Sequence, residues 1–422
     1  MFVGHSVAHR AGGRRDPKNQ TTAVRSRRHD PVVPKSTAPP ALETTWRHIL
    51  ALRLERQGVL ERAGRRRLVD VVGRMVGLHA QVMSSAALQA AARIDGLRPS
   101  DVRDALWERR SLVKTWCFRQ TLHLLTADDL AEFVVAARSL ERWHTPAWLT
   151  YFKMTEQEVD EVLEAIGDVL GDQPMTRVQV VDSVVERVRR PHLRKDMLTG
   201  WGTFLGPAAQ RGRLVFGPSD GRNVAFVDPS AWLGRPIAPG ADPAAADVAL
   251  GRMIVRYLAV FPGSSREMIA RWWDGGRLAA VSRALNVLPE PVVEVDVEGA
   301  RGFVLASDVG ALDAVSPEHP ARLLPGFDPF TNELPRRVES VLNAADHNRV
   351  HRIAGWVTPI VVVDGRVAGT WEIGNGTAGA GSLTVRPFGR WRGGARTELA
   401  AEVDRIAAFL DRRLRLEVPP AV

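Results

Sequence analysis

The chain has 422 residues, a net charge of +9, 45% hydrophobic residues and a single cysteine, which together indicate a folded protein large enough for several structural units. One cysteine excludes an internal disulfide, and no apolar run approaches the roughly 18 residues of a membrane span, so we expect a cytoplasmic protein that needs no membrane. Cys117 lies in the apolar stretch 113–118 and is expected to be a buried thiol rather than a nucleophile.

The N-terminal residues 1–42 are rich in Arg, Pro, Thr and Gly and show no hydrophobic periodicity. Residues 1–40 contain eight Lys or Arg, and their only acidic residues are Asp16 and Asp30, so this segment contributes +6 of the net charge of +9. The composition predicts a disordered basic tail that binds phosphates without sequence preference. The alternative is a dispensable extension from a start codon set too early.

The segment 43–150 combines helical periodicity with a short β-ribbon. Helices are expected from 44 to about 60, over 68–78, 84–93 and 99–109, and from 127, with strands over 112–118 and 121–125. Several helices closed by a two-stranded ribbon are typical of a winged helix.

Two further segments repeat this order of elements. In 151–240, helices are expected over 155–170, 176–188 and 195–210, followed by strands over 213–216 and 224–227. In 241–315, helices are expected over 244–258, 268–273 and 278–288, followed by a hairpin over 292–297 and 302–305. We therefore predict an α+β, mainly helical fold with three tandem winged-helix domains at 43–150, 151–240 and 241–315.

The last segment, 316–422, has a different pattern. Strands over 360–363 and 366–371 flank Asp364-Gly365, a pair that suits a type I′ turn, so a β-hairpin is predicted there. A strand over 383–388 and a closing amphipathic helix over 398–414 are expected to follow.

The most informative polar pair is His79 and Gln81, at the end of the apolar run over 68–78. Two residues along an α-helix correspond to a rotation of roughly 200°, so these side chains can converge only where the chain has left the helix. Ser84 or Ser85 is a suitable N-cap for the next helix. We predict an inter-helix bend that directs both groups into one cleft; the alternative is a capping or hydrogen-bonding pair.

Arg119, Thr121 and His123 alternate along the predicted second strand, so they are expected on one strand face lining a polar cleft. The alternatives are a solvated wing and a satisfied core histidine. The sequence contains no phosphate-binding glycine loop, no His-Glu-x-x-His and no zinc-spaced Cys/His cluster, so neither a cofactor nor a metal is expected.

Five segments occur in an order that resembles a known family: 77–81, 119–124, 323–330, 354–356 and 364–371. Together they resemble the AlkZ-like bacterial DNA glycosylases, a helix-turn-helix family that includes YcaQ. The resemblance implies three winged helices in a C-shaped arrangement around DNA, and monofunctional base excision repair of bulky alkylated purines, of the N7-alkylguanine or N3-alkyladenine type. Some members unhook interstrand crosslinks or give self-resistance to a genotoxic natural product. The expected partner is double-stranded DNA containing alkylated bases, bound by a monomer at the nucleoid.

The resemblance implies a catalytic role for His79 and Gln81. The family's motif is Gln-x-Gln, or Gln-x-Asp in the YcaQ branch, and this chain has His79 where the first Gln would stand. A neutral imidazole can accept a proton from water, whereas a protonated one would oppose the developing oxocarbenium charge. We therefore expect activity to rise with pH through the His79 titration.

DNA contacts are expected from Arg119, Thr121 and His123 in the first unit, and from Arg366 if the Asp364-Gly365 hairpin reaches a groove; otherwise that hairpin is plain surface. The competing function is a non-catalytic winged-helix protein, either a transcriptional regulator or an adduct-sequestering protein. A regulator would make sequence-specific contacts and form a two-fold dimer, for which the sequence offers no coiled coil.

Overall fold

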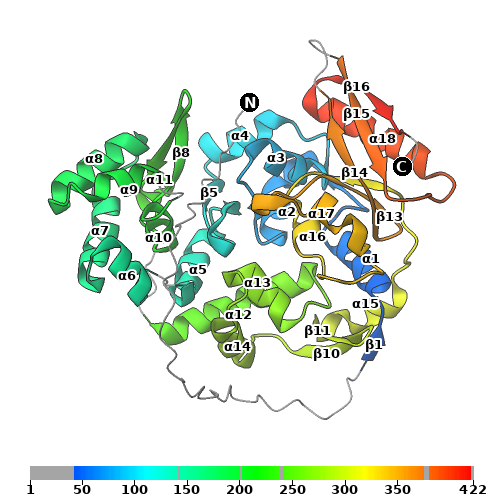
Figure 1. Cartoon of the computed structure of the whole chain (residues 1–422), viewed down its shortest axis with the longest axis horizontal. Helices are drawn as coiled ribbons and strands as arrows, with labels where there is room; N and C mark the ends of the chain where they lie inside the picture. The colour runs from blue at the N-terminus through cyan, green and yellow to red at the C-terminus, as the bar shows by residue number, and fades with distance from the viewer. Residues whose placement is uncertain (1–41, 141–142, 200–201, 238–241, 375–379, 420–422) are drawn as a thin grey trace, which may run out of the picture.

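The computed structural model describes residues 42–140, 143–199, 202–237, 242–374 and 380–419. The predicted basic tail lies outside the described residues except for Leu42, which begins strand β1 (Leu42–Thr44). The fold is α+β, as predicted, and Figure 1 shows helices arranged around several separate sheets. Within these ranges, no helix combines the length and the apolar character that crossing a membrane requires.

The first part of the chain packs helices around a small sheet with the strand order β3-β6-β5. Its elements are α1 (Trp46–Arg56), β2 (Ala63–Gly64), α2 (Leu68–Arg74), β3 (Leu78–His79), α3 (Met83–Ala91), β4 (Ile94–Asp95), α4 (Pro99–Trp107), β5 (Leu112–Trp116), β6 (Leu122–Thr126) and α5 (Asp129–Ala136). The predicted helix over 68–78 is too long, because Val76 and Gly77 have φ of +53° and +98° and turn the chain out of the helix. The serine caps predicted for the next helix are wrong: α3 begins at Met83, and Val82 stands at its N-cap.

The second part has its own sheet, with the order β7-β9-β8. Its elements are α6 (Pro146–Phe152), α7 (Glu156–Asp168), β7 (Met175–Thr176), α8 (Arg177–Val188), α9 (Leu193–Thr199), α10 (Leu205–Gln210), β8 (Val215–Asp220), β9 (Asn223–Val227) and α11 (Pro229–Leu233). The single helix predicted over 195–210 is wrong, since it is two helices. Gly202 between them has φ of +84° and approaches the Trp116 ring so closely that a Cβ would lie 2.7 Å from it.

The third part brings together two segments that are far apart in the sequence. Its elements are α12 (Pro243–Val260), α13 (Arg266–Asp274), α14 (Leu278–Ala284), β10 (Val292–Val297), β11 (Ala300–Leu305) and α15 (Val309–Ala314). The predicted hairpin is confirmed as β10 and β11. Strand β1 adds to it in parallel, with Thr44 opposite Val297, a pairing that local sequence patterns did not indicate.

The C-terminal part is built on a five-stranded sheet with the order β12-β13-β14-β15-β16. Its elements are β12 (Arg322–Leu324), α16 (Pro329–Asn332), α17 (His347–Val350), β13 (Ile360–Val363), β14 (Arg366–Ile373), β15 (Ala380–Pro387), α18 (Ala395–Leu410) and β16 (Arg413–Glu417). The predicted hairpin is confirmed, because Asp364 and Gly365 both have positive φ, 46° and 75°, as a type I′ turn requires. The closing helix is shorter than predicted and ends before Asp411, which has φ of +50°.

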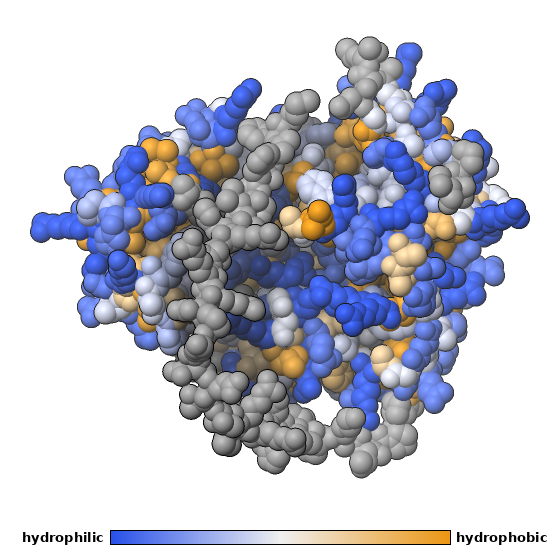
Figure 2. Space-filling model, in the orientation of Figure 1, coloured by the Kyte–Doolittle hydropathy of each residue, from blue (hydrophilic) through white to orange (hydrophobic). Residues whose placement is uncertain are grey.

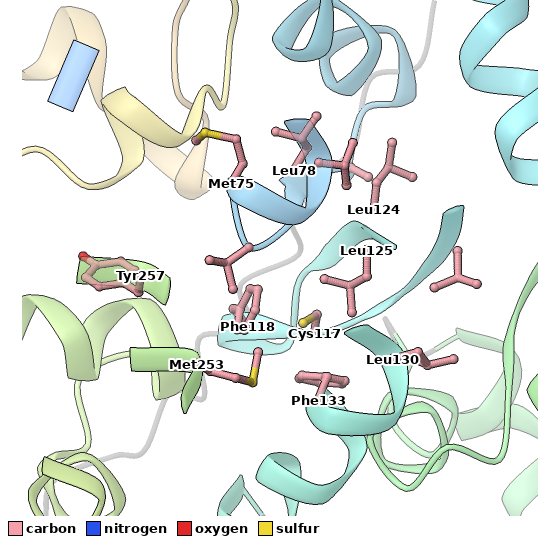
Figure 3. Packing of buried hydrophobic residues seen from close by; sticks show 14 of the residues in the cluster. Met75, Leu78, Cys117, Phe118, Leu124, Leu125, Leu130, Phe133, Met253 and Tyr257 are labelled. Atoms are coloured by element: carbon pink, nitrogen blue, oxygen red, sulfur yellow. The ribbon is translucent and has the colours of Figure 1, made fainter. Parts of the chain in front are cut away.

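Among the described residues, the largest hydrophobic cluster joins the first and third parts, with α5 packed on α12. Figure 3 shows Phe118 at its centre, between Leu125 of β6 and Met253 of α12. Cys117 lies in the same cluster and is buried as predicted; burial raises the pKa of its thiol. The second part forms a lobe at the left of Figure 1 with a core around Phe204. Figure 2 shows mainly hydrophilic side chains on this face, with small separate hydrophobic patches.

Candidate active site

His79 lies on a short strand rather than on a helix. After Gly77 the chain is extended, and β3 pairs antiparallel with β6 so that His79 is opposite His123. The amide of Ala80 continues the pairing by donating to the Leu122 carbonyl over 2.6 Å. The chain therefore leaves the helix before His79 and Gln81, which is the condition that the sequence set for the two side chains to act together.

The His79 ring is buried between two other rings. It is 7% exposed, stacks on Phe327 with centroids 4.8 Å apart and planes 9° apart, and meets His123 edge-on at 5.3 Å. Its Nδ1 is buried and has no hydrogen-bond partner among the described residues. Since a buried polar atom is normally satisfied, this nitrogen is available to a water or a ligand.

A small cavity adjoins the ring. Its volume is about 20 Å³, enough for about one water molecule. It is lined by Met75, Val76, Gly77, His79, Phe118, Arg119, His123, Phe261, Trp272, Pro329, Asn332 and Glu333. Three of the residues singled out from the sequence, His79, Arg119 and His123, thus meet at one cavity, whereas Gln81, Thr121 and Arg366 do not line it.

Burial sets the protonation state of the two histidines. Loss of water around the ring, together with the charge of Arg119, lowers the pKa of His79 to about 3. Burial, followed by the charges of His79 and Arg119, also holds the pKa of His123 well below its ordinary value. Both imidazoles are therefore neutral at physiological pH, and the His79 titration lies near pH 3 rather than near 6.5.

Gln81 lies at the surface, two residues beyond the buried His79. Its Oε1 is 3.5 Å from the Leu122 amide, a long contact that is weak for a hydrogen bond. The carboxamide is therefore free to rotate toward a bound molecule. One member of the pair is thus held rigidly in the interior, and the other is accessible from outside.

Arg119 and Thr121 occupy a tight turn before β6, so the strand face predicted for Arg119, Thr121 and His123 is wrong in its geometry. Arg119 has φ of +54°, and its Nη1 pairs with Glu333 Oε1 at 2.6 Å. Glu333 is buried and also accepts a hydrogen bond from the Tyr257 hydroxyl. Thr121 donates through its Oγ1 to the Phe118 carbonyl. His123 is 3% exposed and packs edge-on against Phe118 at 5.1 Å.

Strained backbone gathers around this cavity. Val76, Arg119, Gln120 and Phe327 all have φ between +53° and +59°, although none is glycine. Such conformations cost of order 1–3 kcal/mol each and persist where the surrounding structure enforces them, which is common at functional sites. A β-branched residue such as Val76 is an especially clear outlier.

A buried ion pair fixes Phe327 over His79. Arg93 and Asp328 are both fully buried and form a two-pronged contact at 2.8 and 2.9 Å. Asp328 also caps α16 by accepting from the Phe330 amide. Gln89 donates to the His79 carbonyl over 3.0 Å and so ties β3 to the same core.

Sequence reasoning missed Phe327, Glu333 and Arg93 as site residues. Phe327 stood inside the apolar segment 323–330, but no local pattern pairs that segment with His79. In the part of the chain that the structure describes, no three His, Cys, Asp or Glu side chains are grouped so that they could hold a metal ion.

Arg366 lies away from His79 at the start of β14 and is exposed. The hairpin turn that precedes it does not stand free, since Gly365 lies against Arg47 and Ala51 of α1. A second cavity, of about 490 Å³, is lined by Arg47, Arg366, Arg390 and Arg392 among others. Arg392 pairs with Asp364 and Glu398, whereas the other three arginines have no ion pair among the described residues.

Comparison with known proteins places this arrangement among enzymes that act on DNA. The family described as "DNA glycosylase AlkZ-like" matches residues 72–409. A protein of Streptomyces sahachiroi named "Interstrand DNA cross-link repair glycosylase" is 33% identical over 349 residues, which span 82% of this chain and 91% of that protein. The solved structure of the S. sahachiroi DNA glycosylase AlkZ superimposes with a TM-score of 0.80 at 31% identity, covering 90% of this chain and all of that one.

Proposed function

The chain belongs to the AlkZ-like DNA glycosylase family, and from this premise we propose that it excises bulky alkylated purines from duplex DNA by attack of water on the glycosidic carbon. It is an enzyme of the DNA glycosylase class. The supporting observation is the neutral, buried His79, which has an Nδ1 without a partner among the described residues and lines a cavity of about one water. The competing function, a non-catalytic DNA-binding protein, does not account for this arrangement.

A purine alkylated at N7 or N3 carries positive charge and is a good leaving group. The transition state resembles an oxocarbenium ion, so a positive charge near the sugar would be unfavourable. The environment that lowers the pKa of His79 to about 3 removes that charge and also makes the imidazole a weak base, so the neutral ring is suited to accept a hydrogen bond from water rather than to take its proton. We assign positioning of the attacking water to His79 and to the exposed Gln81 carboxamide, which would rotate toward it.

The remaining predicted DNA contacts are assigned by their exposure and pairing. Arg366 is exposed and has no ion pair in the described part of the chain, and with Arg47 and Arg390, which share its cavity, it suits phosphate oxygens. Arg119 would contact DNA while held by Glu333, and Thr121 beside it would add a polar contact. His123 is buried, so it would act on the substrate by supporting the His79 ring rather than by reaching a groove.

The wider expectations extend the same proposal. Three winged-helix units at 43–150, 151–240 and 241–315 would surround the duplex in a C shape, with 316–422 completing the cleft. The S. sahachiroi relative is named an interstrand DNA cross-link repair glycosylase, and we extend the proposal to unhooking of interstrand crosslinks. We also propose a monomer that acts at the nucleoid and gives self-resistance to a DNA-alkylating natural product.

The direct test uses a duplex with one N7-alkylguanine, incubated with the full chain and then treated with alkali. Strand cleavage at the adduct after alkali supports base excision. If the strand stays intact after treatment with the enzyme alone, the enzyme is monofunctional, because it removes the base without cutting the backbone. His79→Ala should lose the activity, whereas Val178→Ala on the exposed face of α8 serves as a matched surface control. No abasic site on N7-alkylguanine, N3-alkyladenine or crosslinked duplex would overturn the proposal.

A further inference from the structure

Residues 351–357 form a tight turn that carries apolar side chains into solvent. A β-bridge joins His351 to Val357, and the Arg352 amide donates to the Trp356 carbonyl over 2.8 Å. Ala354 and Gly355 at its tip have φ of +59° and +73°. The backbone is therefore fixed by its own hydrogen bonds and does not need the side chains at the tip for its shape.

Two large apolar residues project from this turn. Ile353 is 94% exposed, the highest value among the exposed large hydrophobic residues of the described chain, and Trp356 is 46% exposed. A single exposed apolar side chain is common on protein surfaces, so exposure by itself assigns no role to Ile353. Its position relative to the active site is the second observation.

The turn is connected to His79 through two successive ring contacts, one edge-on and one stacked. Trp356 meets Phe327 edge-on with centroids 5.0 Å apart, and Phe327 stacks on His79 at 4.8 Å. The base of the turn is thus two ring contacts from the proposed catalytic imidazole. The two centroid distances together are comparable to about three base-pair rises of roughly 3.4 Å each. A duplex whose damaged base is near His79 would therefore also pass the turn.

The charge next to the apolar tip suits a nucleic acid. Arg352 precedes Ile353, is exposed, and has no ion pair among the described residues. Arg349, one turn earlier, lies over the Phe388 ring at 4.4 Å and pairs with Asp346. An apolar side chain flanked by a cation matches the DNA-binding elements that insert a wedge between base steps while an arginine binds the backbone.

We propose that Ile353 is a wedge that enters the base stack next to the base to be excised, with Arg352 on an adjacent phosphate. The inference rests on the proposed glycosylase function and adds a specificity element to it. Unstacking would expose the glycosidic bond to His79 without a tight base pocket, which the cavity of about 20 Å³ could not provide. The cost of opening the step would be offset by the contacts that the deformed duplex makes.

The test compares Ile353→Ala with Ile353→Leu and with Val178→Ala, a change of a half-exposed valine on α8. Single-turnover excision of N7-alkylguanine is measured in a fully paired duplex and in the same duplex with an abasic site opposite the adduct. We expect Ile353→Ala to excise at least about tenfold more slowly from the paired duplex, and at nearly the wild-type rate where the step is already weakened. Ile353→Leu should retain most of the activity, and all three variants should melt at the wild-type temperature.

Binding gives a readout independent of excision. A 2-aminopurine placed beside the adduct should brighten when the wild type or Ile353→Leu binds, and should remain quenched with Ile353→Ala. If Ile353→Ala excises equally slowly from the paired and the weakened duplex, the wedge role is wrong and Ile353 contacts the adduct itself. If its excision rate is unchanged, Ile353 has no role in excision. If the wild type excises nothing, the proposed function fails, whereas the fluorescence still decides whether the turn opens the stack.

Discussion

The pH dependence of excision offers the sharpest test of the catalytic role given to His79. The neutral imidazole is the active form, so the rate should fall only where His79 gains a proton. With the ordinary pKa of 6.5, about 10% of the histidine would be neutral at pH 5.5. With the pKa lowered to about 3 by burial and Arg119, more than about 99% remains neutral there.

The expected result is a rate constant that changes little between pH 5.5 and 7.5 in the wild type, instead of a tenfold fall. Excision from a duplex with N7-alkylguanine is followed under single-turnover conditions by alkali cleavage. The spontaneous loss of the base, measured without protein at each pH, is subtracted.

Phe327→Ala supplies the converse perturbation. Removing the ring that stacks on His79 admits water, so the pKa of His79 should rise toward 6.5 and an acid limb should appear between pH 5 and 7. Adding His79→Gln should remove that limb, because a carboxamide does not titrate. A tenfold fall in the wild type with a midpoint near 6.5, absent in His79→Gln, would refute the reasoning from burial.

Three further perturbations follow from the structure. Gln81→Ala should slow excision by about 10²-fold without lowering the melting temperature, because the side chain is exposed and its one hydrogen bond among the described residues is the long one from the Leu122 amide; a loss of stability equal to the loss of rate would contradict this. Arg93→Met should cost roughly 3–5 kcal/mol in urea unfolding, since it leaves the Asp328 carboxylate buried and unpaired. Adding Asp328→Asn should restore much of that loss; no recovery would count against the charge as its cause. Arg366→Gln should weaken binding to all duplexes and reduce the slope of log affinity against log salt by about 0.9, measured by fluorescence anisotropy. An unchanged slope would show that Arg366 contacts no phosphate.

Local sequence chemistry accounted for a large part of the secondary structure. Hydrophobic periodicity located the main helices, and Asp364-Gly365 specified a type I′ hairpin because both residues tolerate positive φ. The two-residue spacing of His79 and Gln81 required a departure from the helix, which Gly77 provides with φ of +98°. These features depend on residues only a few positions apart, so they can be recognised from the sequence alone.

Predictions failed where a distant partner determines the local shape. The helix over 195–210 is broken at Gly202, which packs against Trp116, a residue of another part of the chain. Strand β1 was not foreseen because its partner, β10, lies about 250 residues later. A short strand has little periodicity of its own and is formed mainly by the edge that it joins.

The amino-acid sequence by itself determined which residues we propose for the chemistry: it placed an imidazole and a carboxamide two residues apart after an apolar helix, in a chain resembling DNA glycosylases. Only the tertiary structure decided what state they are in. Phe327 lies about 250 residues after His79 in the sequence. It stacks on the His79 ring, is held by the Arg93–Asp328 ion pair next to it, and buries the ring. Burial strips water from the imidazole and makes it neutral, and desolvation of this kind depends on packing between segments that no local pattern encodes.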